Sequence, residues 1–399
     1  PKSVMPNWRA EAGRFLPGLR VKLLEKGELE SIEEKLRDCD LLVVNYTQLR
    51  LLAEEFALQK WHAVILDEAQ AIKNPDSQTA KAAYALTAAN RLALSGTPVE
   101  NRLLDLWSIL SFAMPGVLGP RTRFAKLYDK QGDPLARRRL SARVRPFLLR
   151  RTKNQVARDL PPRVEEDIIC ELEGKQETLY RAELKRARQM LLKIQTSKEL
   201  DKQRMNILTS LLRLRQICCH PVLVDAKAAK AESAKLDALL EMLDSLMDEG
   251  HKVLVFSQFL GALEVIRAAL EERQWKHFLL TGDTENRGEL VEEFQKSEGS
   301  AVFLLSLKAG GAGLNLTAAS YVVLFDPWWN PAVENQAIDR THRIGQTQQV
   351  IAYRFVVKGS IEEKIRGLQK AKSALAEDIL GEEAFARGLT LEDFRFLLE

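Results

Sequence analysis

The chain has few cysteines, and none of them is spaced to bind a metal ion. Its 399 residues include only Cys39, Cys170, Cys218 and Cys219, and no two of them form a C-x-x-C pattern. Structural zinc is usually held by such pairs, so a zinc site is not expected. Cys218 and Cys219 are adjacent, and the pair is better explained as buried packing. Nothing in this cysteine usage indicates an oxidising compartment.

Long apolar runs are also missing. No stretch approaches the roughly 20 residues that a membrane-spanning helix needs, and no membrane partner is expected. The first residues, PKSVMPNWRAE, lack the basic-then-apolar signature of a signal peptide. They also lack an initiator methionine, so we expect the chain to be a fragment or a processed piece. The phosphate-binding pattern G-x-x-x-x-G-K-[ST] occurs nowhere in the sequence.

The chain has little net charge overall, but positive charge is concentrated in one segment. The formal net charge is only +4. Between Arg121 and Lys153, however, twelve lysines and arginines face only Asp129 and Asp133. The run can be a solvated helical face, but a basic surface of this density favours contact with nucleic-acid phosphates. Its centre is the triplet Arg137, Arg138 and Arg139.

Short apolar stretches alternate with helical patterns in two parts of the chain, and each ends in polar residues. This alternation predicts an α/β fold with two parallel sheets. Ligands of such sheets bind at the carboxyl ends of the strands. The long charged region 101–225 is helical in period, with few strand signals. The expected strands are 41–44, 63–66 and 91–94 in the first part, then 253–256, 278–280, 301–305, 321–325 and 350–355 in the second.

Asp67 and Glu68 follow directly on the second of these strands. An aspartate at that point can hold Mg²⁺, and the neighbouring glutamate can orient or deprotonate a water molecule. Alternatively, the two acids only cap the next helix. The four apolar residues before them favour the metal site.

A glycine-rich loop, residues 306–315, follows another strand. Glycines allow a backbone to approach a phosphate or a ribose closely. A plain tight turn is the alternative explanation.

The stretch DPWWNP, residues 326–331, reads as a strand end and a rigid turn, because proline fixes φ and cannot continue a strand. A helix starting near Pro331 would place Gln336, Arg340 and Arg343 within one narrow arc. Two fixed guanidinium groups suit a polyphosphate. Arginines on a solvated surface are the equally open alternative.

These pieces together resemble the Swi/Snf-type ATPases, the superfamily-two helicase-like DNA translocases. The resemblance runs over nearly the whole chain, in the order of the family's motifs. DPWWNP and the RIGQ of residues 343–346 are its most specific pieces. The other matches are SVMPNW (3–8, motif Ia), VNY (44–46, Ib), DEAQ (67–70, Walker B), SGTPVEN (95–101, III), VFSQF (255–259, IV), residues 306–315 (V) and 336–346 (VI).

The resemblance implies two RecA-like lobes with ATP and Mg²⁺ between them. Asp67 would hold the metal, Glu68 would activate water, and Arg340 and Arg343 would be arginine fingers. Gln336 would lie near the phosphates and Gly313 near the ribose. Double-stranded DNA would be bound through its backbone, and the candidate contacts are Asn7, Trp8, Asn45, Lys308, Gly310, Gly311 and Arg137–Arg139.

The expected domains follow the same pattern. We expect lobe 1 over residues 1–160, with a basic helical protrusion at 101–153. A helical linker would span 161–225, lobe 2 would span 226–360, and a C-terminal helical brace would span 361–399.

The expected function is an ATP-dependent translocase on duplex DNA, with a protein cargo as a possible further partner. A strand-separating helicase is one rival. A DNA-binding or scaffold protein that does not hydrolyse ATP is the other, because the phosphate loop is not in the sequence. We expect that loop to lie upstream. The resemblance implies a nucleoid-associated location in a prokaryote or a nuclear one in a eukaryote.

Overall fold

The structure is a computed structural model, and it describes residues 5–24, 32–95, 103–128, 134–149, 151, 159–194, 197–228, 231–307, 314–371 and 389–399. The chain forms two compact units: unit 1 is Pro1–Val156 and unit 2 is Ala157–Glu399. Every strand pair in both units is parallel, which confirms the predicted α/β class. None of the helices described is long and apolar enough to cross a membrane.

Unit 1 contains two small sheets, β1 with β2 and β3 with β4. Helices pack on the second sheet around a core that includes Phe56, Ile72 and Phe112. The elements are α1 Met5–Phe15, β1 Val21–Leu23, α2 Ile32–Leu36, β2 Leu41–Val43, α3 Tyr46–Leu51, α4 Ala53–Leu58, β3 Lys60–Leu66, η2 Ala69–Ile72, α5 Gln78–Ala85, β4 Thr87–Ala93, α6 Leu103–Ala113, α7 Arg121–Tyr128, α8 Pro134–Val144 and η3 Arg145–Phe147.

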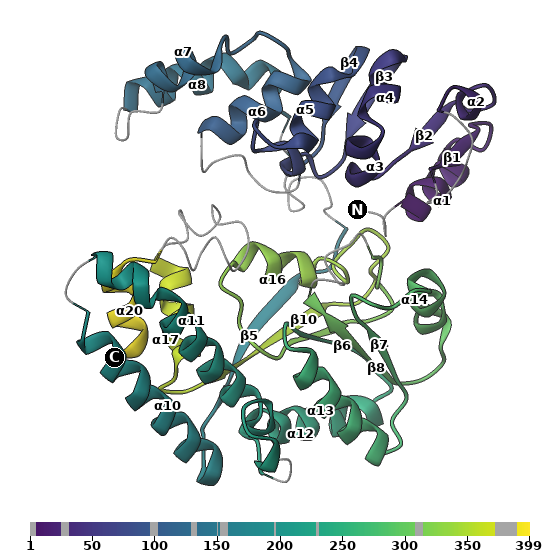
Figure 1. Ribbon diagram of the computed structural model, residues 1–399. Coiled ribbons are helices and arrows are strands. Elements are labelled where there is room, and N and C mark those ends of the chain that lie inside the picture. The colour runs from purple at the N-terminus through teal and green to yellow at the C-terminus, as the bar shows by residue number, and fades with distance from the viewer. Residues whose placement is uncertain are drawn as a thin grey trace. The chain divides into compact units, whose positions relative to one another are not determined.

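The basic region predicted from the sequence forms helices α7 and α8. They pack with α6 around a separate small core that includes Leu110, Phe124 and Leu140. Within unit 1 this group lies at the end away from α1 and β1 (Figure 1). The charged side chains are therefore carried by a satellite of unit 1 with its own apolar centre.

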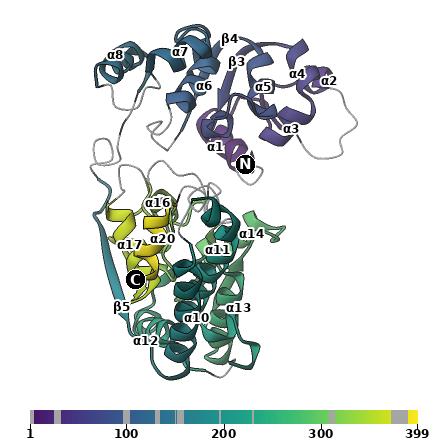
Figure 2. The ribbon, with the colours of Figure 1, turned by 60° about the vertical axis from the view of Figure 1, so that its left-hand side comes forward.

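Unit 2 is built on one six-stranded sheet in the order β5-β10-β9-β6-β8-β7. Helices α10, α11, α17 and α20 pack against one another beside it (Figure 2). The elements are β5 Arg163–Cys170, α10 Gly174–Leu192, α11 Ser197–Cys219, η4 Pro221–Leu223, η5 Ala226–Ala228, α12 Ala234–Asp248, β6 Lys252–Ser257, α13 Leu260–Glu272, β7 His277–Leu280, α14 Arg287–Lys296, β8 Ala301–Ser306, β9 Tyr321–Leu324, α16 Pro331–Ile338, β10 Val350–Val357, α17 Ile361–Ala371 and α20 Leu391–Leu398.

The central strands are apolar on both faces because both faces are covered. In β6, Val253 and Val255 belong to one core, with the helices α10–α13, while Leu254 and Phe256 belong to a second core with α14 and α16. This explains why the strand reads as a continuous apolar run in the sequence.

The organisation of residues 161–225 differs from the predicted helical linker. Its first part is β5, which pairs with β10 over eight residues and is an edge strand of the unit 2 sheet. Helices α10 and α11 pack into the same core. The strand was hidden by Glu165, Glu166 and Asp167, whose charges obscure its alternation. Glu165 and Asp167 are used in ion pairs with Arg354, and Asp167 also pairs with Arg366.

Lys235 and Glu362 form an ion pair in the core of unit 2, with both side chains fully buried. The Nζ–Oε1 distance is 2.6 Å, and Nζ also donates to the carbonyl of Phe325 at 2.8 Å. Burial raises the pKa of the Glu362 carboxyl group. The pair joins α12 and α17 to the end of β9.

We predict that Lys235→Met lowers the free energy of unfolding by about 3–5 kcal/mol, because it leaves a buried carboxylate without its cation. Adding Glu362→Gln removes that charge and keeps an acceptor for the Val357 amide. The double variant should recover much of the loss. Urea unfolding of the three proteins measures this, and a double variant no more stable than the single one would contradict it.

Candidate functional site

The acid pair of unit 1 lies at the carboxyl end of β3, as predicted. The following backbone is held across the sheet, because the Ala69 amide donates to the carbonyl of Leu94 at 2.8 Å. Glu68 has φ +51° and ψ +53°, a left-handed conformation that few residues other than glycine adopt. Such strained residues cluster at functional sites.

A short chain of hydrogen bonds fixes the Glu68 carboxylate. Gln70 Nε2 donates to Glu68 Oε2 at 2.6 Å, and Ser95 Oγ donates to Gln70 Oε1 at 3.0 Å. The end of β4 is thereby connected to Glu68. Sequence reasoning did not assign a role to Gln70, although its place two residues after Glu68 was a usable signal.

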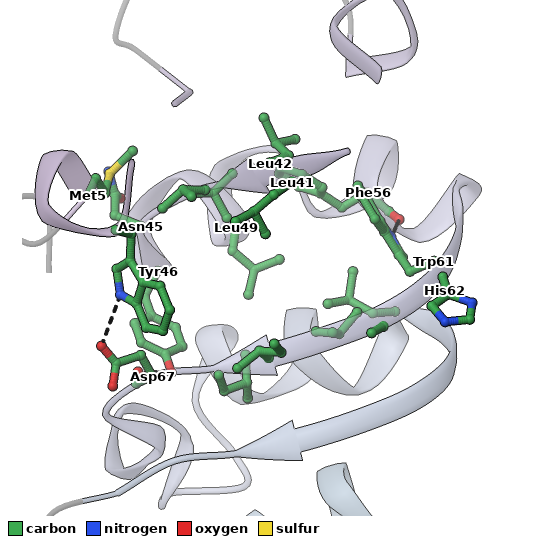
Figure 3. A pocket seen from close by; sticks show the side chains of 18 of the residues that line it. Met5, Leu41, Leu42, Asn45, Tyr46, Leu49, Phe56, Trp61, His62 and Asp67 are labelled. Carbon is green, nitrogen blue, oxygen red and sulfur yellow. Dashed lines mark hydrogen bonds between the residues drawn. The ribbon is translucent and has the colours of Figure 1, made fainter. Parts of the chain in front are cut away.

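Asp67 is held by three neighbours. Its carboxylate accepts from the Trp8 indole Nε1 at 3.3 Å and from the Glu68 amide at 3.0 Å, and its carbonyl accepts from the Tyr46 hydroxyl at 2.7 Å. Burial, together with the charges of Asp67 and Glu68, raises the pKa of Tyr46 far above its usual range, so this hydroxyl remains a donor. Figure 3 shows the indole bond to Asp67.

The carboxylate oxygens of Asp67 are suitable ligands for a magnesium ion. Each carboxylate oxygen accepts one of these N–H bonds and keeps a further lone pair. Hard oxygen ligands of this kind are those that Mg²⁺ prefers, usually with several water molecules retained.

A mostly apolar cavity of about 350 Å³ opens beside Asp67. It is bordered by β2 and β3, with Met5, Leu49 and Trp61 among the side chains around it (Figure 3). Within the described residues, β2 pairs only with β1 and β3 only with β4. The cavity therefore separates two strand edges of unit 1.

The second group of candidate residues follows α16 in unit 2. The prediction of one helix that includes Arg340 and Arg343 was wrong, because α16 ends at Ile338. Only Gln336 is on the helix, where it is half-buried. Residues 339–346, called here the arginine turn, form successive tight turns with bonds such as Arg340 N to Ala337 O and Gln346 N to Arg343 O.

Hydrogen bonds to carbonyl groups elsewhere in unit 2 hold the chain in turns after the helix ends. The Gln346 Nε2 group donates to the carbonyls of Thr317, Ala319 and Thr341, and the amide of Leu316 donates to the carbonyl of Arg340. Gly345 has φ +103°, which a side chain would disfavour. These bonds tie the arginine turn to the segment before β9.

The two candidate arginines differ in exposure. Arg340 is 5% exposed, whereas Arg343 is half-buried and its Nε donates to the carbonyl of Asp339 at 3.1 Å. Both lie in the arginine turn rather than on a helical arc. Their guanidinium groups are therefore positioned by turn geometry, not by helical spacing.

A buried charged cluster underlies the turn 326–330 before α16. Asp326 accepts from Ser257 Oγ at 2.5 Å and from Gln258 Nε2 at 2.5 Å, and it lies 3.9 Å from Arg215 Nη2. Arg215 also donates to the carbonyl of Pro327 at 2.8 Å. Its guanidinium group lies over the Trp329 ring, 5.3 Å from the ring centre. Sequence reasoning missed Arg215, since it is one of three arginines of α11 and nothing in its local spacing sets it apart.

The remaining predicted residues are in varied places. Asn45 caps α3, with its side chain accepting from the Gln48 amide, and Asn7 is exposed on α1. Arg138 and Arg139 are exposed on α8, and Arg137 is on the same helix. Lys308, Gly310, Gly311 and Gly313 lie outside the described residues.

The fold and these residues define a class: an α/β protein with two RecA-like lobes. Residues 1–223 match the model of the SNF2-related domain, and residues 234–345 match the helicase conserved C-terminal domain. The chain therefore belongs to the SNF2 family of ATP-dependent helicases and translocases, which confirms the predicted resemblance.

Individual relatives agree with this membership. The chain is 38% identical to an uncharacterised ATP-dependent helicase of Mycoplasma pneumoniae and 36% identical to a putative ATP-dependent helicase/translocase of Bacillus subtilis. All of the chain matches, but it spans only 38% and 44% of those proteins. It is also similar to the Sulfolobus solfataricus SWI2/SNF2 ATPase core in complex with dsDNA, with 33% identity and a TM-score of 0.50, over 100% of this chain and 84% of that one.

We predict that Arg215→Lys loosens the turn 326–330 while keeping the buried charge balanced. Lysine carries a compact ammonium group and lacks the planar guanidinium that stacks on Trp329. Tryptophan emission should move to longer wavelength and become easier to quench with acrylamide. In a background that carries both Trp328→Phe and Trp329→Phe, and so has no tryptophan in this turn, the same substitution should produce little change, and an equal change there would contradict the assignment.

Proposed function

We propose that this chain is part of an ATP-driven motor that translocates on double-stranded DNA. The observation that carries the proposal is the joint occurrence of a strained, hydrogen-bonded Asp67–Glu68 pair in unit 1 and the arginine turn in unit 2, within a chain of the SNF2 family. The solved Sulfolobus core bound to dsDNA supports duplex DNA as the track.

In this proposal unit 1 activates the attacking water. Gln70 donates to one carboxylate oxygen of Glu68 and so fixes the orientation of this side chain. The oriented carboxylate would then position the attacking water and accept its proton. Asp67 would hold Mg²⁺. When bound, MgATP supplies the phosphoryl group to be transferred and a counter-charge on its oxygens.

Unit 2 would stabilise the negative charge that develops during transfer. Arg340 and Arg343 are permanently charged, and their planar forks suit phosphate oxygens. The turn holds their backbone before the reaction, so little reorganisation is needed. Gln336 and Gly313 would contact the nucleotide beside them.

DNA contacts in this proposal are made mainly to phosphates, so they position the protein without reading sequence. The candidates are the basic face of α8 with Arg138 and Arg139, and residues of motifs Ia, Ib and V such as Asn7 and Lys308. Trp8 and Asn45 also hold structural bonds within unit 1. A substitution at either would therefore combine two effects.

We predict that Arg343→Ala, in the complete natural protein, lowers DNA-stimulated ATP turnover by about 10³-fold or more, as loss of an arginine finger does. A matched control is Arg267→Ala, an arginine of α13 that is 42% exposed and pairs with Glu264 and Glu271. The control should keep normal turnover. If Arg343→Ala stays within a few-fold of the wild type while folding normally, the finger role is rejected.

We also predict that reversing Arg137, Arg138 and Arg139 to glutamate weakens duplex binding and flattens its salt dependence. Each lost phosphate contact should reduce the slope of log K against log salt by about 0.9. The control reverses three exposed charges of α10, Arg181, Lys185 and Arg186, and thereby matches the change in net charge. Equal slopes for both variants would identify the α8 run as ordinary solvated surface.

A further inference from the structure

The first residues of unit 2 contact the arginine turn. Residues 159–163, called here the connector, lead into β5, and Arg163 is the first residue of that strand. Arg163 Nη2 donates to Asn335 Oδ1 at 3.0 Å, and its Nη1 lies 3.6 Å from Asp339 Oδ1. The Arg163 side chain is 23% exposed, so water screens these contacts only in part. One guanidinium fork thus joins the last turn of α16 to the start of the arginine turn.

A second contact is made by Pro161 of the connector. His342 Nε2 lies 2.8 Å from the carbonyl of Pro161, and the histidine is 8% exposed. A carbonyl can only accept, so Nε2 must carry the hydrogen and donate. Pro161 and Pro162 have φ fixed by their rings, which makes this acceptor stiff.

Each of the two contacts involves a residue directly next to a candidate arginine. Asp339 directly precedes Arg340, and His342 directly precedes Arg343. Arg163 is itself braced, because it also pairs with Glu165 of β5, and Glu165 pairs with Arg354 of β10. The connector itself belongs to unit 2, which begins at Ala157. The connector therefore contacts the side chain that directly precedes each of the two candidate arginines.

We propose that the connector is a positioning element for the arginine turn, and that Arg163 on the connector and His342 on the turn are the positioning residues. Their role in turnover rests on the proposed function; their role in holding the turn does not. Arg163 fits because a planar fork can engage an amide oxygen and a carboxylate at once. A displacement of about 1 Å in catalytic groups can reduce rates by about 10²-fold, so a loosened connector would act at a distance from the chemistry.

The first experiment measures hydrogen exchange of the amides of residues 339–346 in this chain. Arg163→Met and His342→Phe should each raise exchange about tenfold, as expected when a contact of roughly 1.4 kcal/mol is lost. His342→Gln should restore protection, because its amide can still donate to the Pro161 carbonyl. Lys358→Met is the matched control: it removes a cation that pairs with Glu171, just beyond the far end of β5, and should leave the turn unchanged.

The second experiment measures ATP turnover of the complete natural protein with the same substitutions. Arg163→Met should lower kcat about tenfold, with the KM for ATP and the duplex affinity within about twofold. A purely structural role would instead lower thermal stability and change all three. Asp339→Asn, at the half-buried partner of Arg163, tests the same contact if Arg163→Met folds poorly.

The outcomes separate the two proposals. If the wild-type protein does not hydrolyse ATP, the proposed function fails and the exchange data alone judge the connector. Unchanged exchange in Arg163→Met, or in Asp339→Asn where the first variant does not fold, overturns the inference. Equal loss of protection in His342→Phe and His342→Gln overturns the part assigned to His342.

Discussion

A carboxylate that is shut away from water has to be surrounded by donors, and Asp326 is the point where unit 2 meets this requirement. It is 1% exposed, and burial raises its pKa, while Arg215, Ser257 and Gln258 favour the charged form. These donors come from α11 and from the end of β6. The turn 326–330 therefore has one arrangement in which its first residue is satisfied, and the direction in which α16 leaves the sheet follows from it.

A second buried carboxylate continues this control along α16. Glu334 is 1% exposed; it accepts from the Trp328 amide at 2.8 Å and from Arg354 Nε at 3.0 Å. It thus joins the turn, the helix and β10. Removing either partner of such a pair is strongly destabilising, because the other charge stays buried. The helix is consequently held by charge at its start and by the bonds of Gln346 beyond its end.

How far the sequence predicts this structure depends on whether the determining contacts are local. The buried strands were predictable, because runs such as residues 253–256 and 301–305 are apolar without interruption. The position of Asp67 and Glu68 at the carboxyl end of a strand was predictable for the same reason, since the pair directly follows such a run. The end of α16 at Ile338 was not, because it depends on Gln346 reaching carbonyls at Thr317 and Ala319. Likewise, β5 is a strand whose acidic residues are satisfied by arginines some 190 residues later in the chain.

The same distinction explains which of the proposed functional residues can be found by motif. Glu68, Arg340 and Arg343 are recognised because each lies within a short characteristic sequence motif, DEAQ for Glu68 and residues 336–346 for the two arginines. Arg215 and Arg163 act through Asp326 and Asp339, which are separated from them by more than a hundred residues. Their partners are brought close only when the sheet has formed, with β5 at one edge beside β10. Residue spacing in the sequence does not reveal positioning residues of this kind. They are required because a buried or half-buried acidic group needs a cation at a fixed place, and this need leaves no pattern along the chain.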